Sequence, residues 1–201
     1  MRHFASLALA CSVLALPLPA LGGAQIYEPL ADSVRSALQA AISDRAVPVL
    51  TFANPEHAHR WLYEMSRRLQ KRIPDRKERV ALLKTVHYEA TRAGLDPQLV
   101  LGVIEVESGF RKYAVSSAGA RGYMQVMPFW VKLIGRPRDN LFHLRTNLRY
   151  GCVILRHYLT LDKGDYFRAL GRYNGSLGSA AYPNAVHALW RGRWKYDGPI
   201  G

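Results

Sequence analysis

The sequence is poor in cysteine and in acidic residues. It has only two cysteines among 201 residues, Cys11 and Cys152, which excludes a disulfide framework and a cysteine-rich zinc site. There are 15 Asp and Glu residues against 28 Lys and Arg, which gives a formal net charge of +13. Such a basic chain favours anionic partners, and nucleic acid, an acidic membrane face and an anionic cell-wall polymer all qualify.

The sequence also lacks an apolar run of the roughly 20 residues that a membrane span requires. Its one extended apolar run, 4–18, is interrupted by proline, follows Arg2 and gives way to small residues. This pattern is typical of a secretory signal peptide. We therefore expect residues 1–24 to be removed by cleavage after Ala24, or alternatively after Ala20, and the exported protein to be soluble in the periplasm.

Two alternatives concern this end of the chain. A membrane anchor is disfavoured because the apolar run is short, and a lipoprotein would need lipid on Cys11, which almost no apolar segment precedes. Export also removes cytoplasmic nucleic acid as an explanation of the positive charge, so we expect no nucleic-acid partner and no stable membrane span.

Strand-like alternation of polar and apolar residues is almost absent, so the predicted fold class is mainly α. Helix starts are indicated by Asn54 and Asp96, each followed by proline, and by Asp165, while Gly94 marks a helix end. The expected helices cover 29–43, 55–72, 76–93, 97–107, a segment resuming near Tyr123, 146–161, 165–173 and 183–191.

One carboxyl group falls on an apolar helix face within the segment 99–107, LVLGVIEVE. At about 100° per residue, Glu107 extends the stripe of Val103 and Ile104, whereas Glu105 faces roughly the opposite way and should tolerate substitution. Burial without a compensating charge raises the pKa of a carboxyl group. A carboxylic acid that stays protonated near neutral pH can donate the proton that glycosidic cleavage requires. The alternative is a helix-end glutamate that reaches solvent.

The motifs that follow carry a family resemblance. Glu107 opens the sequence ESGF, residues 116–128 read SxxGAxGxMQxMP, and Tyr173 and Asn174 form a YN pair. In this order and spacing, the motifs resemble the soluble lytic transglycosylases of the bacterial cell wall over about residues 79–180. The resemblance implies a mainly α, lysozyme-like helical domain with a cleft.

The resemblance also implies a division of the chain. We expect the lysozyme-like domain to cover residues 76–195, with a helical extension over 25–75 before it and a short tail over 196–201 after it.

The roles of individual residues follow from the same motifs. Glu107 matches the catalytic acid of the family. The residues that match its substrate-binding positions are Ser116, Gln125, Met127, Tyr173 and Asn174. Because the family's tyrosine faces the catalytic glutamate, we expect the Tyr173 hydroxyl to hydrogen-bond near Glu107. The alternatives are a purely structural Tyr173, a loop-capping role for Ser116 and Gln125, and a core position for the methionine.

The implied reaction is a lyase-type cleavage of peptidoglycan. It breaks the β-1,4 bond between N-acetylmuramic acid and N-acetylglucosamine, leaves a 1,6-anhydromuramic acid end, and uses one carboxylate without water, metal or cofactor. Asp139, Asp162 and Asp165 are candidate second carboxylates that nothing in the sequence places in the cleft.

Two other functions stay open: a goose-type muramidase, which hydrolyses the same polymer, and a non-catalytic wall-binding module. Peptidoglycan glycan strands are the expected partner, with a secretion or conjugation machinery as a further candidate. The sequence leaves open whether chain ends or interiors are attacked.

Overall fold

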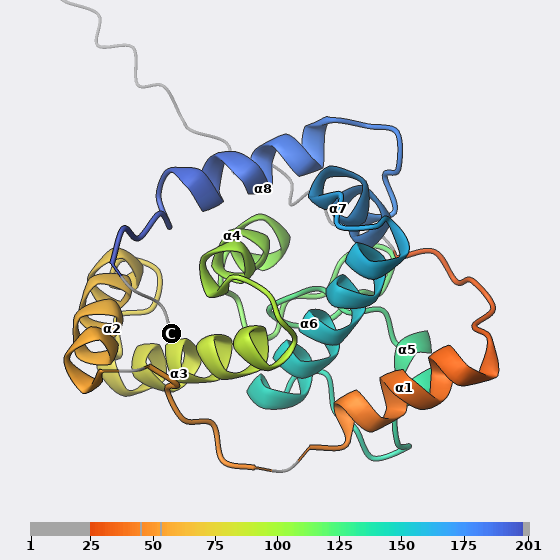
Figure 1. Cartoon of the computed structure of the whole chain (residues 1–201), viewed down its shortest axis with the longest axis horizontal. Helices are drawn as coiled ribbons and strands as arrows, with labels where there is room; N and C mark the ends of the chain where they lie inside the picture. The colour runs from red at the N-terminus through yellow and green to blue at the C-terminus, as the bar shows by residue number, and fades with distance from the viewer. Residues whose placement is uncertain (1–24, 45, 53, 199–201) are drawn as a thin grey trace, which may run out of the picture.

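The computed structural model describes residues 25–44, 46–52 and 54–198, so the predicted signal peptide lies outside the described residues. Within them the helices are α1 (Asp32–Ile42), α2 (Pro55–Leu69), α3 (Arg76–Arg92), α4 (Pro97–Ser108), α5 (Phe129–Ile134), α6 (Leu144–Leu161), α7 (Tyr166–Asn174) and α8 (Ala181–Arg191) (Figure 1). β-Type pairing in this part of the chain is limited to two isolated bridges, Val115–Arg121 and Arg121–Val126. The predicted mainly α class is confirmed. None of the helices in the described part is long and apolar enough to cross a membrane.

The helix boundaries follow local signals in the sequence. The side chains of Asn54, Asp96 and Asp165 each accept a hydrogen bond from a main-chain N–H in the first turn of the helix they precede, as predicted. Gly94, just after α3, has a left-handed backbone with φ +67°, the conformation that ends many helices.

The prediction that a helix resumes near Tyr123 is wrong about where the helix begins. Residues 123–128 form a tight loop, and α5 begins only at Phe129. Gly122 and Gln125 both have positive φ values, +76° and +48°, which a right-handed helix does not accommodate. The loop therefore keeps a turn conformation through the MQxMP motif.

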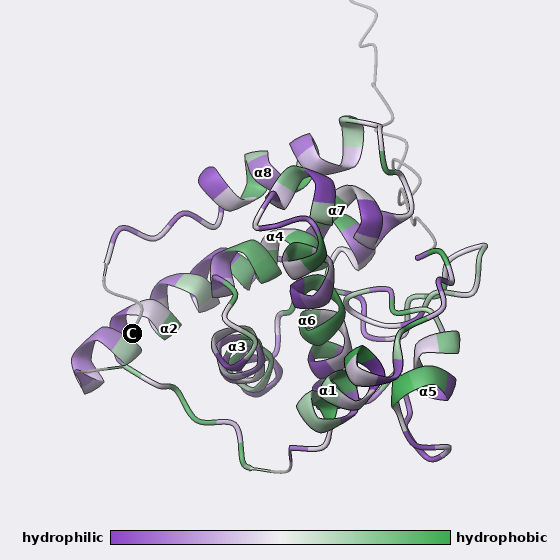
Figure 2. Ribbon diagram, turned by 45° about the vertical axis from the view of Figure 1, so that its right-hand side comes forward, coloured by the Kyte–Doolittle hydropathy of each residue, from purple (hydrophilic) through white to green (hydrophobic). Residues whose placement is uncertain are grey.

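Helix α4 runs through the middle of the molecule and contacts α3 and α8 (Figures 1 and 2). Its residues 99–101, 103 and 104 are fully buried, so the helix is apolar around most of its circumference rather than along one stripe. The same buried core extends from Leu38 on α1 and Trp61 on α2 to Trp194 beyond α8. The helices of the extension thus share the core that holds α4, and the domain boundary at residue 76 stays a prediction.

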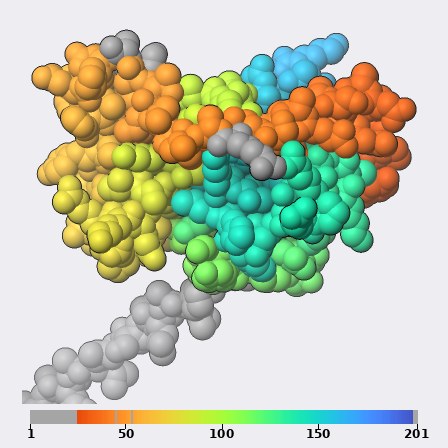
Figure 3. Space-filling model, turned by 90° about the horizontal axis from the view of Figure 1, so that it is seen from below, coloured from red at the N-terminus to blue at the C-terminus, as the bar shows by residue number. Residues whose placement is uncertain are grey.

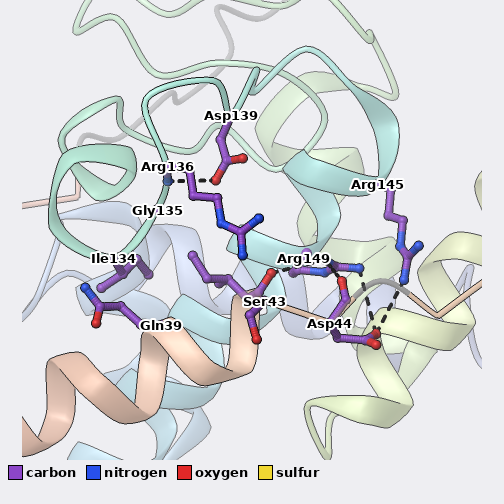
Figure 4. Close-up of a pocket in the computed structure, with 10 residues that line it drawn as sticks. Gln39, Ser43, Asp44, Ile134, Gly135, Arg136, Asp139, Arg145 and Arg149 are labelled. Carbon is purple, nitrogen blue, oxygen red and sulfur yellow. Dashed lines mark hydrogen bonds and ion pairs between the residues drawn. The ribbon is translucent and has the colours of Figure 1, made fainter.

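Ionic contacts fasten the end of α1 to α3 and α6. The Asp44 carboxylate lies 3.4 Å from Arg145 and 3.8 Å from Arg149 (Figure 4). The Glu89 carboxylate on α3 lies 3.0 Å from Arg149. Arg149 also donates to the main-chain carbonyl oxygens of Ile42 and Asp44. From there the chain crosses the outside of the molecule to reach α2 (Figure 3).

Candidate active site

Glu107 lies in the last turn of α4, and its side chain is buried, with 1% of its surface exposed. No ion pair to this carboxyl group is found among the described residues. Burial raises the pKa of Glu107 to about 8, although hydrogen bonds from Tyr182 and Asn174 act in the opposite direction. The carboxyl group is therefore protonated at neutral pH, which is the state that a general acid needs.

Tyr182 of α8 holds one oxygen of this carboxyl group. Its hydroxyl donates a hydrogen bond to Glu107 Oε1 at 2.6 Å. Burial raises the pKa of Tyr182 well above its ordinary value, so the hydroxyl keeps its proton and remains a donor. Glu107 Oε2 is buried and has no hydrogen-bond partner among the described residues. Oε2 is thus the oxygen left to carry a transferable proton.

Tyr173 was predicted to place its hydroxyl near Glu107, and the partner of this hydroxyl is a main-chain group rather than the carboxyl group. The Tyr173 ring is fully buried, and its hydroxyl donates to the main-chain carbonyl oxygen of Met124 at 2.7 Å. The charge of Glu107 still contributes to raising the pKa of Tyr173, after burial as the larger cause, so the two groups are neighbours. Tyr182 makes the direct contact instead.

Sequence reasoning missed Tyr182 because the last helix was predicted to begin one residue after it. A usable signal was present. Tyr182, Val186 and Trp190 are spaced four residues apart, which places them on one helix face, and all three are buried.

Asn174 ends α7, and its side chain is buried beside Glu107. It hydrogen-bonds to the Glu107 carboxyl group, and this bond lowers the pKa of Glu107. The structure therefore brings together Glu107 and the second residue of the YN pair.

The remaining predicted residues have mainly local contacts. The Ser116 hydroxyl oxygen accepts a hydrogen bond from the Ala120 N–H at 3.1 Å and closes its own turn. The Gln125 side chain donates to the carbonyl oxygens of Ala114 and Gly122 at 3.1 and 2.9 Å, so it braces the loop from inside. These are the contacts of loop-capping side chains. Met127 is half-buried and packs against the core.

Three side chains fix residues 121–127, here called the site loop, next to the end of α4. The Ser108 hydroxyl donates to the Tyr123 carbonyl oxygen at 2.7 Å, and Tyr173 holds the next carbonyl along the chain. The buried Asn147 side chain accepts from the Met124 N–H at 2.8 Å and donates to the Arg121 carbonyl oxygen at 2.8 Å. Two of these three side chains adjoin Glu107, because Ser108 follows it in the chain and Tyr173 is close enough for the charge of Glu107 to affect its pKa.

The three candidate second carboxylates are engaged in other contacts. Asp139 accepts from the Tyr150 hydroxyl at 2.5 Å, Asp162 pairs with Arg172 at 2.9 Å, and Asp165 caps α7. No carboxylate is among the groups that shift the pKa of Glu107.

A cavity of about 440 Å³ is lined by Asp139, but not by Glu107 or by any of the predicted substrate-binding residues. It is bounded by the end of α1, the start of α6 and the segment 134–139, with Arg136, Arg145 and Arg149 among its lining residues (Figure 4). Among the described residues, no cluster of three or more His, Cys, Asp and Glu side chains is arranged to hold a metal ion.

A protein-family model and several known proteins are similar to this chain. The family model described as the transglycosylase SLT domain matches residues 84–185, which are 102 of the 201 residues. The transglycosylase of Enterobacteria phage PRD1 is 35% identical over 111 residues, which are 51% of this chain and 40% of that protein.

Two further relatives are described as membrane-bound lytic murein transglycosylase C. The protein of Actinobacillus pleuropneumoniae serotype 5b (strain L20) is 54% identical over 46 residues, 23% of this chain and 13% of its own. That of Glaesserella parasuis serovar 5 (strain SH0165) is 37% identical over 97 residues, 44% and 26% of the two chains. The chain thus matches less than half of the length of these relatives.

Proposed function

Because the chain belongs to the transglycosylase SLT domain family, we propose that it is a peptidoglycan lytic transglycosylase. Its substrate is the β-1,4 bond between N-acetylmuramic acid and N-acetylglucosamine, and its product carries a 1,6-anhydromuramic acid end. The observation that carries the proposal is the buried Glu107 carboxyl group with a pKa of about 8. The printed names of the relatives, transglycosylase and lytic murein transglycosylase, support the same reaction.

In the first step, protonated Glu107 donates its proton to the glycosidic oxygen. The bond between that oxygen and C1 of N-acetylmuramic acid breaks, and the leaving sugar departs as an alcohol. Oε2 is the donor oxygen, because Oε1 accepts the hydrogen bond from Tyr182. General acid catalysis of this kind contributes on the order of 10²–10⁴-fold in rate.

In the second step, ionised Glu107 takes the proton from the C6 hydroxyl of the same N-acetylmuramic acid. The C6 oxygen forms a bond to C1, and the acid returns to its starting state. One carboxyl group serves both steps, and no water is consumed. The nucleophile belongs to the substrate, so the step has the rate advantage of an intramolecular reaction.

Asn174 and Tyr182 act as positioning residues in this proposal, since both bond to the carboxyl group of Glu107. Tyr173 acts one contact further away, by holding the main chain of the site loop. We propose that the segment containing Ser116, Gln125 and Met127 lies along the bound glycan. The side chains of Ser116 and Gln125 maintain the shape of this segment.

We place this activity in the periplasm, after removal of the signal peptide predicted over residues 1–24. Peptidoglycan stem peptides carry free carboxylates. Cleavage removes Arg2 and no acidic residue, so the formal charge falls from +13 to +12 and still suits such a polymer. The lysozyme-like domain is proposed to cover residues 76–195. A secretion or conjugation machinery that needs an opening in the wall is a further candidate partner.

Mass spectrometry of the fragments released from purified sacculi tests the proposal. Ring closure gives products lighter by one water than those of hydrolysis. We expect 1,6-anhydro ends with the wild-type protein and strongly reduced release with Glu107→Gln. Ordinary reducing ends would establish a goose-type muramidase instead, and release by Glu107→Gln at a near-wild-type rate would remove Glu107 from the reaction.

A further inference from the structure

A short stretch of the extension, residues 25–28, lies against the site loop; we call it the strap. The Gln25 side chain is 3% exposed, and its carboxamide makes two reciprocal hydrogen bonds. Its NH₂ group donates to the Gln125 carbonyl oxygen at 3.0 Å, and its carbonyl oxygen accepts from the Met127 N–H at 2.9 Å. Residues 100 and 102 positions apart in the chain are thereby joined.

Several other main-chain groups of the site loop are paired within the domain. The carbonyl oxygens of Tyr123 and Met124 accept from Ser108 and Tyr173, as described above. Val126 exchanges both of its main-chain hydrogen bonds with Arg121. The Gln125 carbonyl and the Met127 N–H are thus the pair that the strap satisfies, and without Gln25 they are available to another polar ligand.

The strap is held by few contacts beyond Gln25. Ile26 and Tyr27 are 60% and 57% exposed, and the Tyr27 ring meets Phe129 edge-on. Glu28 lies 3.7 Å from Arg172, with half of its side chain exposed. Little apolar surface is buried by the strap, so a ligand can displace it at small cost.

The carboxamide of Gln25 has the same chemistry as an acetamido group. Each has an N–H donor and a carbonyl acceptor, and both sugars of the proposed substrate carry an acetamido group. An incoming acetamido group can therefore use the Met127 N–H or the Gln125 carbonyl once Gln25 has left. The strap lies outside the family match, residues 84–185, so this occupant is an addition made by the chain's own extension.

We propose that Gln25 is an intramolecular competitor of the glycan, occupying the main-chain donor and acceptor of the site loop until an acetamido group of the substrate displaces it. The inference rests on the proposed function, because it requires an N-acetylated glycan as the ligand. Only molecules in which the strap is released can bind glycan at these groups. The apparent association constant is therefore the intrinsic one multiplied by the fraction of released molecules.

Isothermal titration with a chitin hexasaccharide, whose sugars all carry acetamido groups, tests the inference. We compare the wild-type exported protein with Gln25→Ala and with Gln70→Ala, a matched change at an exposed glutamine after α2. Loss of two neutral hydrogen bonds should tighten binding roughly threefold to tenfold in Gln25→Ala. Gln70→Ala should bind like the wild-type protein.

A second variant guards against loss of folding. Gln25→Glu keeps the side-chain shape but places an acceptor against the Gln125 carbonyl oxygen, so it should also release the strap and tighten binding. Amide hydrogen exchange at Met127 should quicken in both Gln25 variants without sugar. Equal or weaker binding by both variants would overturn the competitor role while leaving the function intact. Absence of sugar binding by all proteins, with Met127 exchange still quickened, would instead count against the proposed glycan function and the competitor role that rests on it.

Discussion

Two glutamates of α4, separated by one residue, have opposite environments. Glu105 accepts hydrogen bonds from the guanidinium groups of Arg72 and Arg193 at 2.5 and 2.9 Å, and from the Trp194 indole N–H at 2.7 Å. Glu107 has no cation beside it in the described part of the chain, and its burial raises its pKa to about 8.

The difference shows that the angular position of a side chain around the helix axis decides which environment it enters. Residues two positions apart on a helix are about 200° apart around its axis. Glu105 therefore meets Arg72, which follows α2, and Arg193 and Trp194 of the C-terminal segment. Glu107 instead bonds to Asn174 of α7 and Tyr182 of α8. Glu105 is an anchor that bonds to two arginines and a tryptophan, and Glu107 is a neutral acid.

The largest expected effect is on the acid. Glu107→Gln replaces the carboxyl group by a near-isosteric amide that cannot donate and retrieve a proton. Turnover on sacculi should fall by on the order of 10²–10⁴-fold, with the melting temperature at neutral pH not lowered. A turbidity assay and a melting curve measure both. Near-normal turnover would show that the acid lies elsewhere.

The next effect concerns the group that holds the acid. Tyr182→Phe removes the 2.6 Å hydrogen bond to Glu107, and the rate should fall roughly tenfold to a hundredfold because the carboxyl group is less well placed.

The pH dependence of kcat/KM in Tyr182→Phe distinguishes a contact with the acid from a merely structural role of Tyr182. Activity needs the protonated acid, so in the wild-type protein kcat/KM should decline as pH rises through about 8. The hydrogen bond from Tyr182 lowers the pKa of Glu107, so its loss should move this decline to higher pH. An unshifted profile would contradict the assigned contact.

Substitution of Glu105 should lower the stability of the protein. Glu105→Gln weakens charge-assisted bonds to Arg72 and Arg193, so the free energy of unfolding should fall by roughly 1–3 kcal/mol. Glu64→Gln is a matched control, because its surface pairs with Arg67 and Arg68 are worth about 1 kcal/mol or less. Denaturant titration should separate the two variants. Folded Glu105→Gln should keep wild-type turnover, and a large loss of turnover would remove the distinction between the two glutamates.

The smallest effect is expected at Tyr173. Tyr173→Phe loses the hydrogen bond to the Met124 carbonyl oxygen, which should lower the free energy of unfolding by about 1–2 kcal/mol. The pH profile of kcat/KM should stay where it is in the wild-type protein. A profile displaced as in Tyr182→Phe would restore Tyr173 as the direct partner of Glu107.

The helical frame could be predicted because its signals are local. Asn54, Asp96 and Asp165 each precede a helix whose first turn they cap, and Gly94 follows the end of α3. The placement of Glu107 on an apolar face also needed only helical periodicity.

The contacts around Glu107 could not be predicted in the same way, because they join distant segments. Tyr182 is 75 residues from Glu107, and no local pattern says which tyrosine reaches it. The helix expected near Tyr123 is not formed there, because the backbone of Gln125 is left-handed. The partners of Glu105 could not be predicted either, because they come from segments before and after α4. Such contacts depend on tertiary packing rather than on spacing along the chain.

The central claim is that burial keeps Glu107 protonated at neutral pH, and carbon-detected NMR titration of glutamate side-chain carboxyl groups tests it most directly. We expect one carboxyl resonance to titrate near pH 8, far above the ordinary glutamate range of about 4.3, and to be missing from Glu107→Gln. If every glutamate in the wild-type protein titrated within the ordinary range, Glu107 would be ionised at neutral pH and the account of it as the acid would be contradicted.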